Sequence, residues 1–139
     1  MKWHDGQPVT LDDVIFSFQA PAGDKAPMYK PFVTDIASIE KTGEQTLRFK
    51  LKQTNTTFLT ASLAKINLIP KHIWEPVLKD LAGKPETAEQ LKEVSKIGSG
   101  PFKLVRWAPN EEILLERFGD HFQAPKVQRW IMACHLELA

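Results

Sequence analysis

The sequence predicts an α+β fold with a mixed, mostly antiparallel sheet and three or four helices. Three observations predict this class. Apolar residues recur at helical spacing in residues 11–20 and again in 73–81. Apolar and polar residues alternate through much of residues 36–51 and 102–117. The alternating segments are joined by short turns, and strands joined in this way pair antiparallel.

Size and charge narrow the possible functions. The chain has 139 residues, of which 18 are Lys or Arg and 17 are Asp or Glu, so its net charge is +1. This balance argues against nucleic-acid or membrane-surface binding, because both require a concentrated basic face. No apolar run approaches the ~20 residues of a membrane span, and no secretory leader stands at Met1. The single Cys134 excludes an intrachain disulfide.

The first part of the chain predicts a strand, a turn and a capped helix. Lys2–His4 reads as a strand end that enters a turn at Asp5-Gly6. We expect that turn to be structural, although a ligand contact is the alternative. Thr10 and Asp13 have the spacing of helix-capping residues for a helix over 11–20. Pro21 and Gly23 predict its end.

The middle of the chain predicts a loop, a hairpin and three further helices. Residues 21–31 read as a loop. Ile36–Glu40 and Thr46–Leu51 predict a β-hairpin with Gly43-Glu44 between the strands. A short helix is expected around Phe58, Leu59 and Leu63, and the others are expected over 73–81 and 87–94.

The last third of the chain predicts strands. Gly98-Ser99-Gly100-Pro101 is a sharp break. It is followed by strands over 102–107, 112–117 and 127–135, with a turn at Pro109-Asn110. We interpret the break as a tight crossing between domains; backbone amides near a ligand are the alternative, and both can hold.

The order of these motifs resembles family 5 of the extracellular solute-binding proteins, the receptors of bacterial ABC importers for peptides, nickel and related solutes. The segment 3–18, WHDGQPVTLDDVIFSF, is similar to the family's W-x-DG-x-P-(V/L)-T-x-x-D-V signature. Residues 68–74 and 97–104 resemble its I-P-K-H and G-T-G-P-(Y/F)-K-L segments. Residues 113–117 and 125–127 resemble I-x-L-E-R and K-P-K-V. The sequence departs from the pattern at 119–122, where the family's Trp is missing.

The resemblance implies a periplasmic-binding-protein type II fold in a much longer protein. Residues 1–97 would form its small extra domain, and residues 98–139 the crossover and first strands of the neighbouring lobe. The parent would be periplasmic or otherwise extracytoplasmic, bind a solute, most simply a peptide, between two lobes, and deliver it to the ABC permease. The alternative is a purely structural or partner-contact domain without ligand contact. A truncated chain is therefore expected.

Four residues are the candidates for ligand contact. Met28 and Tyr29 lie in one loop, and Lys65 and Asn67 lie in another that leads to the I-P-K-H segment. Tyr29 is the only tyrosine and could stack or donate a hydrogen bond. Packing of Tyr29 against Phe32 is the alternative.

The sequence predicts neither an enzyme nor a metal or cofactor site. The four histidines lack zinc-hydrolase spacing, and Cys134 and His135 would point to opposite faces of a strand. No serine has a G-x-S-x-G context, and residues 98–101 lack the lysine of a phosphate loop. The sequon at Asn55 is interpreted as chance.

Overall fold

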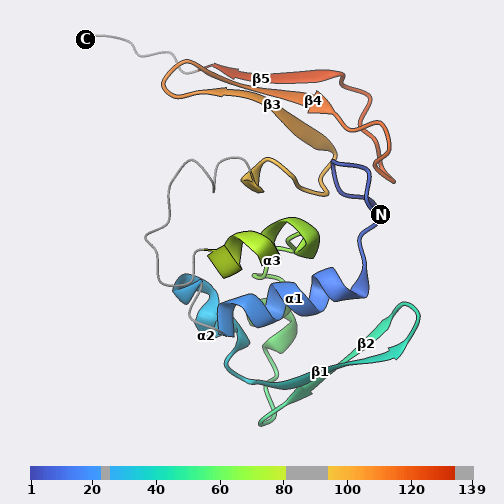
Figure 1. The fold of residues 1–139 in the computed structure, drawn as a ribbon, viewed down its shortest axis with the longest axis vertical. Helices are drawn as coiled ribbons and strands as arrows, with labels where there is room; N and C mark the ends of the chain where they lie inside the picture. Colours follow the sequence, from blue (N-terminus) through green and yellow to red (C-terminus); the bar gives the residue numbers. More distant parts are fainter. Residues whose placement is uncertain (23–25, 81–93, 134–139) are drawn as a thin grey trace. The chain divides into compact units, whose positions relative to one another are not determined.

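A computed structural model of the chain describes residues 1–22, 26–80 and 94–133 (Figure 1). The chain divides into two compact units. One unit combines Met1–Val9 with Pro85–Ala139, and the other is Thr10–Lys84. These limits differ from a division at residue 97, because the first nine residues hydrogen-bond to the segment before β3. The assignment of residues 1–97 and 98–139 to two domains of a longer receptor stays a prediction.

The second unit begins with helix α1 (Leu11–Ala22). Its start has the predicted capping arrangement. The Thr10 N–H donates to Asp13 Oδ2 at 2.8 Å, and the Asp13 N–H donates to Thr10 Oγ1 at 3.3 Å. The helix continues through Pro21 to Ala22, two residues beyond its predicted end. The ring of Pro21 fixes a helical φ, but Pro21 has no N–H to donate to Ser17 O, so the last turn of α1 lacks that hydrogen bond.

The segment predicted as a loop after α1 contains two short helical turns. They are the 3₁₀ helix η1 (Pro27–Tyr29) and α2 (Lys30–Val33). Each has a proline in its first turn. Proline is tolerated there because the N–H groups of a first turn have no partner within the helix. The prediction of an irregular loop over residues 21–31 was therefore wrong for residues 27–31, and α2 continues past that range to Val33.

The predicted hairpin is confirmed. Strands β1 (Ile36–Gly43) and β2 (Thr46–Leu51) pair antiparallel with Ile39 opposite Phe49. Its ion pairs are exposed. Lys50 Nζ contacts Glu40 Oε1 at 2.6 Å, and Lys41 Nζ contacts Asp12 Oδ2 of α1 at 2.8 Å. Hydrogen bonds from these lysines lower the pKa of Glu40 and of Asp12 below their usual values.

The predicted helix around Phe58 is a π-helix, η2 (Phe58–Leu63). The Ala64 N–H donates to Leu59 O, five residues earlier, at 3.1 Å. Phe58 is buried in this turn, whereas Leu59 is 69% exposed. Helix α3 (Lys71–Asp80) follows and confirms the expected helix, although Pro76 lies inside it. The helix expected over 87–94 lies outside the described residues, apart from its last position.

The core of this unit joins its helices to the hairpin. Phe18, Val33 and Ile66 are buried at its centre. Phe49 of β2 meets the Phe18 ring edge-on, with the ring centroids 5.1 Å apart. The partly buried side chains around them are Val14, Phe32, Ile36, Ile39, Leu63 and Leu68. The core therefore combines side chains from α1, α2, the hairpin, η2 and the loop after η2.

The first unit is built on a three-stranded antiparallel sheet in the order β3-β4-β5 (Figure 1). Its strands are β3 (Phe102–Ala108), β4 (Glu112–Arg117) and β5 (Arg129–Ala133). Asn110, with φ of 64°, makes the predicted turn between β3 and β4. The last two residues of the strand expected over 127–135 lie outside the described residues.

The N-terminal nine residues form a tight turn in this unit. Lys2 bridges to Pro8, and the Gly6 N–H donates to Trp3 O at 2.9 Å. Gly6 has φ of +90°, which favours glycine and confirms the turn predicted at Asp5-Gly6. The Trp3 side chain is fully buried.

Candidate functional site

The first candidate pair lies on the helical turn η1. Met28 is 79% exposed and Tyr29 is 36% exposed. The Tyr29 ring centroid lies 6.5 Å from that of Phe32, with the ring planes tilted by 53°. Tyr29 therefore packs against Phe32, as the alternative interpretation expects, and still presents part of its surface to solvent.

The second candidate pair lies in the loop after η2. Lys65 and Asn67 are exposed, and Ile66 between them is buried. The N–H groups of Lys65 and Ile66 both donate to Ser62 O, at 3.1 and 3.3 Å. These bonds fix the backbone that turns the side chains of Lys65 and Asn67 outward.

Both pairs are anchored in the same core. Ile66 stands between Lys65 and Asn67, and Val33 ends the helical segment that follows Tyr29; these two residues and Phe18 form the buried cluster. In the described part of the chain, no hydrogen bond, ion pair or ring contact joins one pair to the other. The structure thus places the pairs on one folding unit without assembling them into an enclosed site.

Two polar side chains of α1 fix the segment that leaves the second loop. The Ile69 N–H donates to Ser17 Oγ at 2.9 Å, and the Lys71 N–H donates to Asp13 Oδ1 at 2.8 Å. Ser17 and Asp13 are buried, at 2% and 4% exposure. Sequence reasoning assigned Asp13 to the cap of α1 alone and missed its bond to the first residue of α3. The bond spans 58 positions, so no local pattern could reveal it.

The Gly98–Pro101 break is held by His4. The His4 N–H donates to Gly98 O at 2.8 Å. The Gly98 N–H donates to His4 Nδ1 at 3.2 Å, and His4 Nε2 lies 3.0 Å from Gly100 O. The Gly98 amide is therefore occupied within the protein, which supports the structural interpretation of this break.

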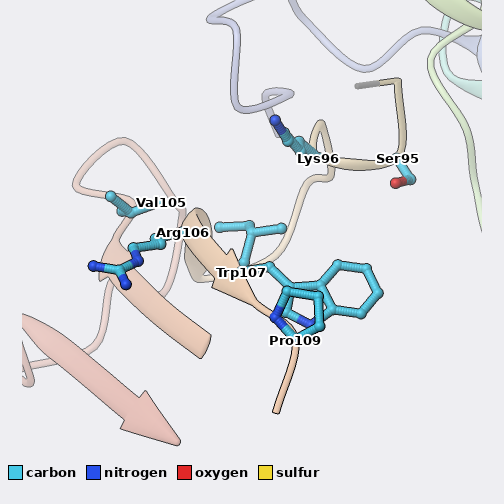
Figure 2. A pocket seen from close by; sticks show the side chains of 7 residues that line it. Ser95, Lys96, Val105, Arg106, Trp107 and Pro109 are labelled. Carbon is cyan, nitrogen blue, oxygen red and sulfur yellow. The ribbon is translucent and has the colours of Figure 1, made fainter. Parts of the chain in front are cut away.

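A hollow of about 340 Å³ lies beside β3, and sequence reasoning did not identify it. Ser95 and Lys96 line it from the segment before the strand (Figure 2). Trp107 supplies the largest side chain, and the Arg106 guanidinium lies apart from the Trp107 indole (Figure 2). The other lining residues are Leu104, Val105 and Pro109. The signal in the sequence was Trp107, an aromatic residue in a strand.

The described structure also shows how possible metal ligands and the sequon residue Asn55 are arranged. Within residues 1–22, 26–80 and 94–133, no three His, Cys, Asp or Glu side chains are grouped to hold a metal ion. Asn55, the residue of the sequon, is committed to local structure. Its Nδ2 donates to Asp35 Oδ2 at 2.8 Å, and its Oδ1 accepts from the Thr57 N–H at 2.9 Å.

Two relatives of known sequence are described as peptide-binding proteins, and both are several times longer than this chain. The chain is 33% identical over 129 residues to the oligopeptide-binding protein AppA of Bacillus subtilis, covering 88% of this chain and 22% of that protein. It is 33% identical over 121 residues to the probable peptide-binding protein YejA of Agrobacterium fabrum, covering 87% of this chain and 19% of the relative. The chain thus spans about a fifth of the length of the curated relatives it matches.

Solved structures show the same fold. A periplasmic oligopeptide-binding protein of Thermotoga maritima aligns with a TM-score of 0.79 and 26% identity, over 98% of this chain and 25% of that one. AppA of Bacillus subtilis, solved in complex with a nonapeptide, aligns with a TM-score of 0.73 and 30% identity, over 94% and 25%. NikZ of Campylobacter jejuni, in complex with Ni(L-His), gives 0.69 and 28%, over 95% and 25%. These likenesses confirm the α+β fold and the predicted resemblance.

The family profile gives the most direct assignment. The profile described as "Bacterial extracellular solute-binding proteins, family 5 Middle" matches residues 1–134. The chain belongs to family 5 of the bacterial extracellular solute-binding proteins.

Proposed function

We propose that the chain is part of the solute-binding component of an ABC importer, and that the parent protein takes a peptide. The observation that carries this proposal is the family match over residues 1–134. Relatives described as oligopeptide-binding and a structure with a bound nonapeptide favour a peptide over other solutes. The parent protein closes two lobes around the solute and delivers it to the permease, as an extracytoplasmic receptor.

Members of this family bind solutes, so the chain is not part of an enzyme. The family is extracellular, and among the described residues no helix is long and apolar enough to cross a bilayer. The periplasmic location and the permease partner belong to the proposal for the parent protein.

The exposed sheet of the first unit supports a place within a larger lobe. Cross-strand partners share a face of a sheet, so Trp107, Ile113 and Met132 lie on one face, and Leu104, Leu115 and Trp130 lie on the same face. Trp107, Trp130 and Met132 are each more than 40% exposed. An exposed apolar face of this kind normally marks a contact surface. In the parent protein, further polypeptide of the same lobe covers it.

Met28, Tyr29, Lys65 and Asn67 are the proposed contributions of the second unit to solute contact. Tyr29 supplies an aromatic face, Lys65 a cation, and Asn67 both a hydrogen-bond donor and an acceptor, and all three are at least partly exposed. Such groups can bind the carboxylate, amides and side chains of a peptide. Their shared core keeps them on one unit, and the rest of the cleft lies in the lobes outside this chain.

The test uses the full-length parent protein and isothermal titration calorimetry with a panel of synthetic peptides of up to nine residues. Tyr29→Ala is expected to weaken peptide binding by about tenfold, the effect of losing one aromatic contact. Tyr29→Phe keeps the ring contact with Phe32 and tests the hydroxyl alone. Phe122→Ala is a matched control, because Phe122 is an aromatic side chain that is 67% exposed in the other unit.

The alternative, a structural domain without ligand contact, is favoured by the ring contact between Tyr29 and Phe32. In that case Tyr29→Ala, Lys65→Ala and Asn67→Ala leave peptide affinity at the level of the Phe122→Ala control. Failure of every peptide to bind the unmodified parent protein would reject the peptide assignment itself.

A further inference from the structure

We propose that His4 is a pH-sensitive clasp on the Gly98–Gly100 segment, opened by protonation of its imidazole. Both ring nitrogens face backbone groups of this segment. Nδ1 lies 3.2 Å from the Gly98 N, and Nε2 lies 3.0 Å from the Gly100 O. Positions 4 and 98 are 94 residues apart in the chain, so the ring joins two distant segments of the first unit.

The partners of the ring define its protonation state. The Gly98 N–H can only donate, so Nδ1 must present a lone pair. The Gly100 carbonyl can only accept, so Nε2 must carry the hydrogen. His4 is therefore neutral in the closed clasp, as the Nε2–H tautomer.

Packing holds the ring in this position. The His4 ring meets the Phe118 ring edge-on, with the centroids 5.2 Å apart, and Phe118 is buried. A Cβ placed on Gly98 would lie 3.4 Å from His4 Cε1. The ring thus lies within van der Waals contact distance of the position that a Cβ at residue 98 would occupy.

Protonation removes one of the two side-chain bonds. A proton and the Gly98 N–H compete for the same Nδ1 lone pair. In the imidazolium, the Nδ1–H would therefore face the Gly98 N–H, and two donors cannot bond to each other. The Nε2–H bond to Gly100 O and the backbone bond from the His4 N–H to Gly98 O both survive. One proton therefore frees the Gly98 amide without detaching the two segments.

The charged groups around the clasp are mostly paired or turned to other partners. Lys2 Nζ pairs with Asp120 Oδ2 at 3.0 Å, and Lys103 Nζ lies 4.4 Å from the centre of the Phe118 ring. Neither nitrogen of His4 contacts a carboxylate in the described part of the chain. The same segments also carry the Met1 amino group, Asp5, Lys96, Arg117 and His121.

Two NMR measurements on the uniformly ¹⁵N-labelled chain test the clasp. Long-range ¹H–¹⁵N spectra at neutral pH are expected to show His4 as the Nε2–H tautomer. Hydrogen exchange of the Gly98 amide is then followed while His4 is titrated. Its protection factor is expected to fall about five- to tenfold in step with protonation of His4, the effect of losing one hydrogen bond.

Three variants distinguish the loss of the His4–Gly98 hydrogen bond from other effects of low pH on the chain. His4→Asn keeps an oxygen acceptor near the Nδ1 position and does not titrate, so Gly98 protection should become independent of pH. His4→Phe keeps the ring contact with Phe118 and should abolish that protection at every pH. His121→Asn is the matched control: His121 Nδ1 accepts from the Gln123 N–H at 3.1 Å, and its removal should leave the Gly98 response unchanged. An Nδ1–H tautomer, or steady Gly98 protection in the unmodified chain while His4 titrates, would overturn the proposal.

Discussion

At the scale of single residues, Asp13 makes more hydrogen bonds than its place in a capping motif predicts. Its Oδ2 accepts from the Thr10 N–H and from the Thr10 Oγ1–H, and its Oδ1 accepts from the Lys71 N–H. One buried carboxylate thereby caps α1 and satisfies a donor at the start of α3. Because both carboxylate oxygens accept hydrogen bonds, removal of the Asp13 carboxylate should destabilise the starts of both helices.

We expect Asp13→Ala to lower the free energy of unfolding by about 2–4 kcal/mol, from a lost cap and a buried donor left without its acceptor. Asp12→Ala is the control, because Asp12 is exposed and forms a surface ion pair with Lys41. Urea unfolding followed by circular dichroism measures both. Equal, small losses for the two variants would show that the Asp13 bonds are dispensable.

The same residue shows how far sequence reasoning reaches. The spacing of Thr10 and Asp13 is local, so the cap of α1 could be predicted from it. The bond to Lys71, and the bonds from Gly98 and to Gly100 at His4, join residues 58 to 96 positions apart. Such contacts follow from tertiary packing, which no short pattern encodes. Tyr29 shows the same contrast: its contact with Phe32, three residues along the chain, could be predicted, and its contact with a solute stays a prediction.

At the scale of elements, the sequence predicted strands more faithfully than it predicted short helices. Alternation over 36–51 and 102–117 specified both hairpins, because a strand's period of two is fixed by its geometry. Residues 27–33 and 58–63 instead form 3₁₀, single-turn and π structure. These segments are too short to show helical periodicity, and the burial of Val33 and Phe58 in the core decides their geometry.

The sheet β3-β4-β5 yields a prediction of its own, because its apolar face is exposed in this chain. We expect the 139-residue chain to self-associate as its concentration rises, through the face that carries Trp107, Trp130 and Met132. The double variant Trp107→Lys/Met132→Lys should reduce that association, because two buried charges at a contact are strongly unfavourable. Sedimentation velocity at several concentrations measures the change.

Ile131→Lys is the matched control for the sheet. Ile131 is 59% exposed, similar to Trp107 at 58%, but it pairs with Leu114 and so lies on the opposite face. It should leave self-association unchanged. If Ile131→Lys reduces self-association and the double variant does not, the contact lies on the face of Arg129 and Ile131. The face that carries Trp107 would then be wrongly assigned as the contact surface.

At the scale of the whole molecule, each compact unit has its own buried aromatic residues. Phe18 lies in the core of Thr10–Lys84, whereas Trp3 and Phe118 are buried in the unit that contains the three-stranded sheet. Separate cores allow separate unfolding, because a cavity destabilises the elements that surround it. The N-terminal turn, Met1–Val9, belongs to the same unit as the sheet. We therefore expect the turn and the sheet to lose stability together.

We therefore expect Phe18→Ala and Trp3→Ala to act on different amides, each costing its own unit about 3–5 kcal/mol. Native-state hydrogen exchange should show protection lost in α1, β1, β2 and α3 for Phe18→Ala, with β3–β5 retained. Trp3→Ala should give the reverse, even if the affected unit unfolds completely. Val127→Ala, at a position 56% exposed, should change neither set. Uniform loss of protection in both core variants would mean that the two units unfold as one.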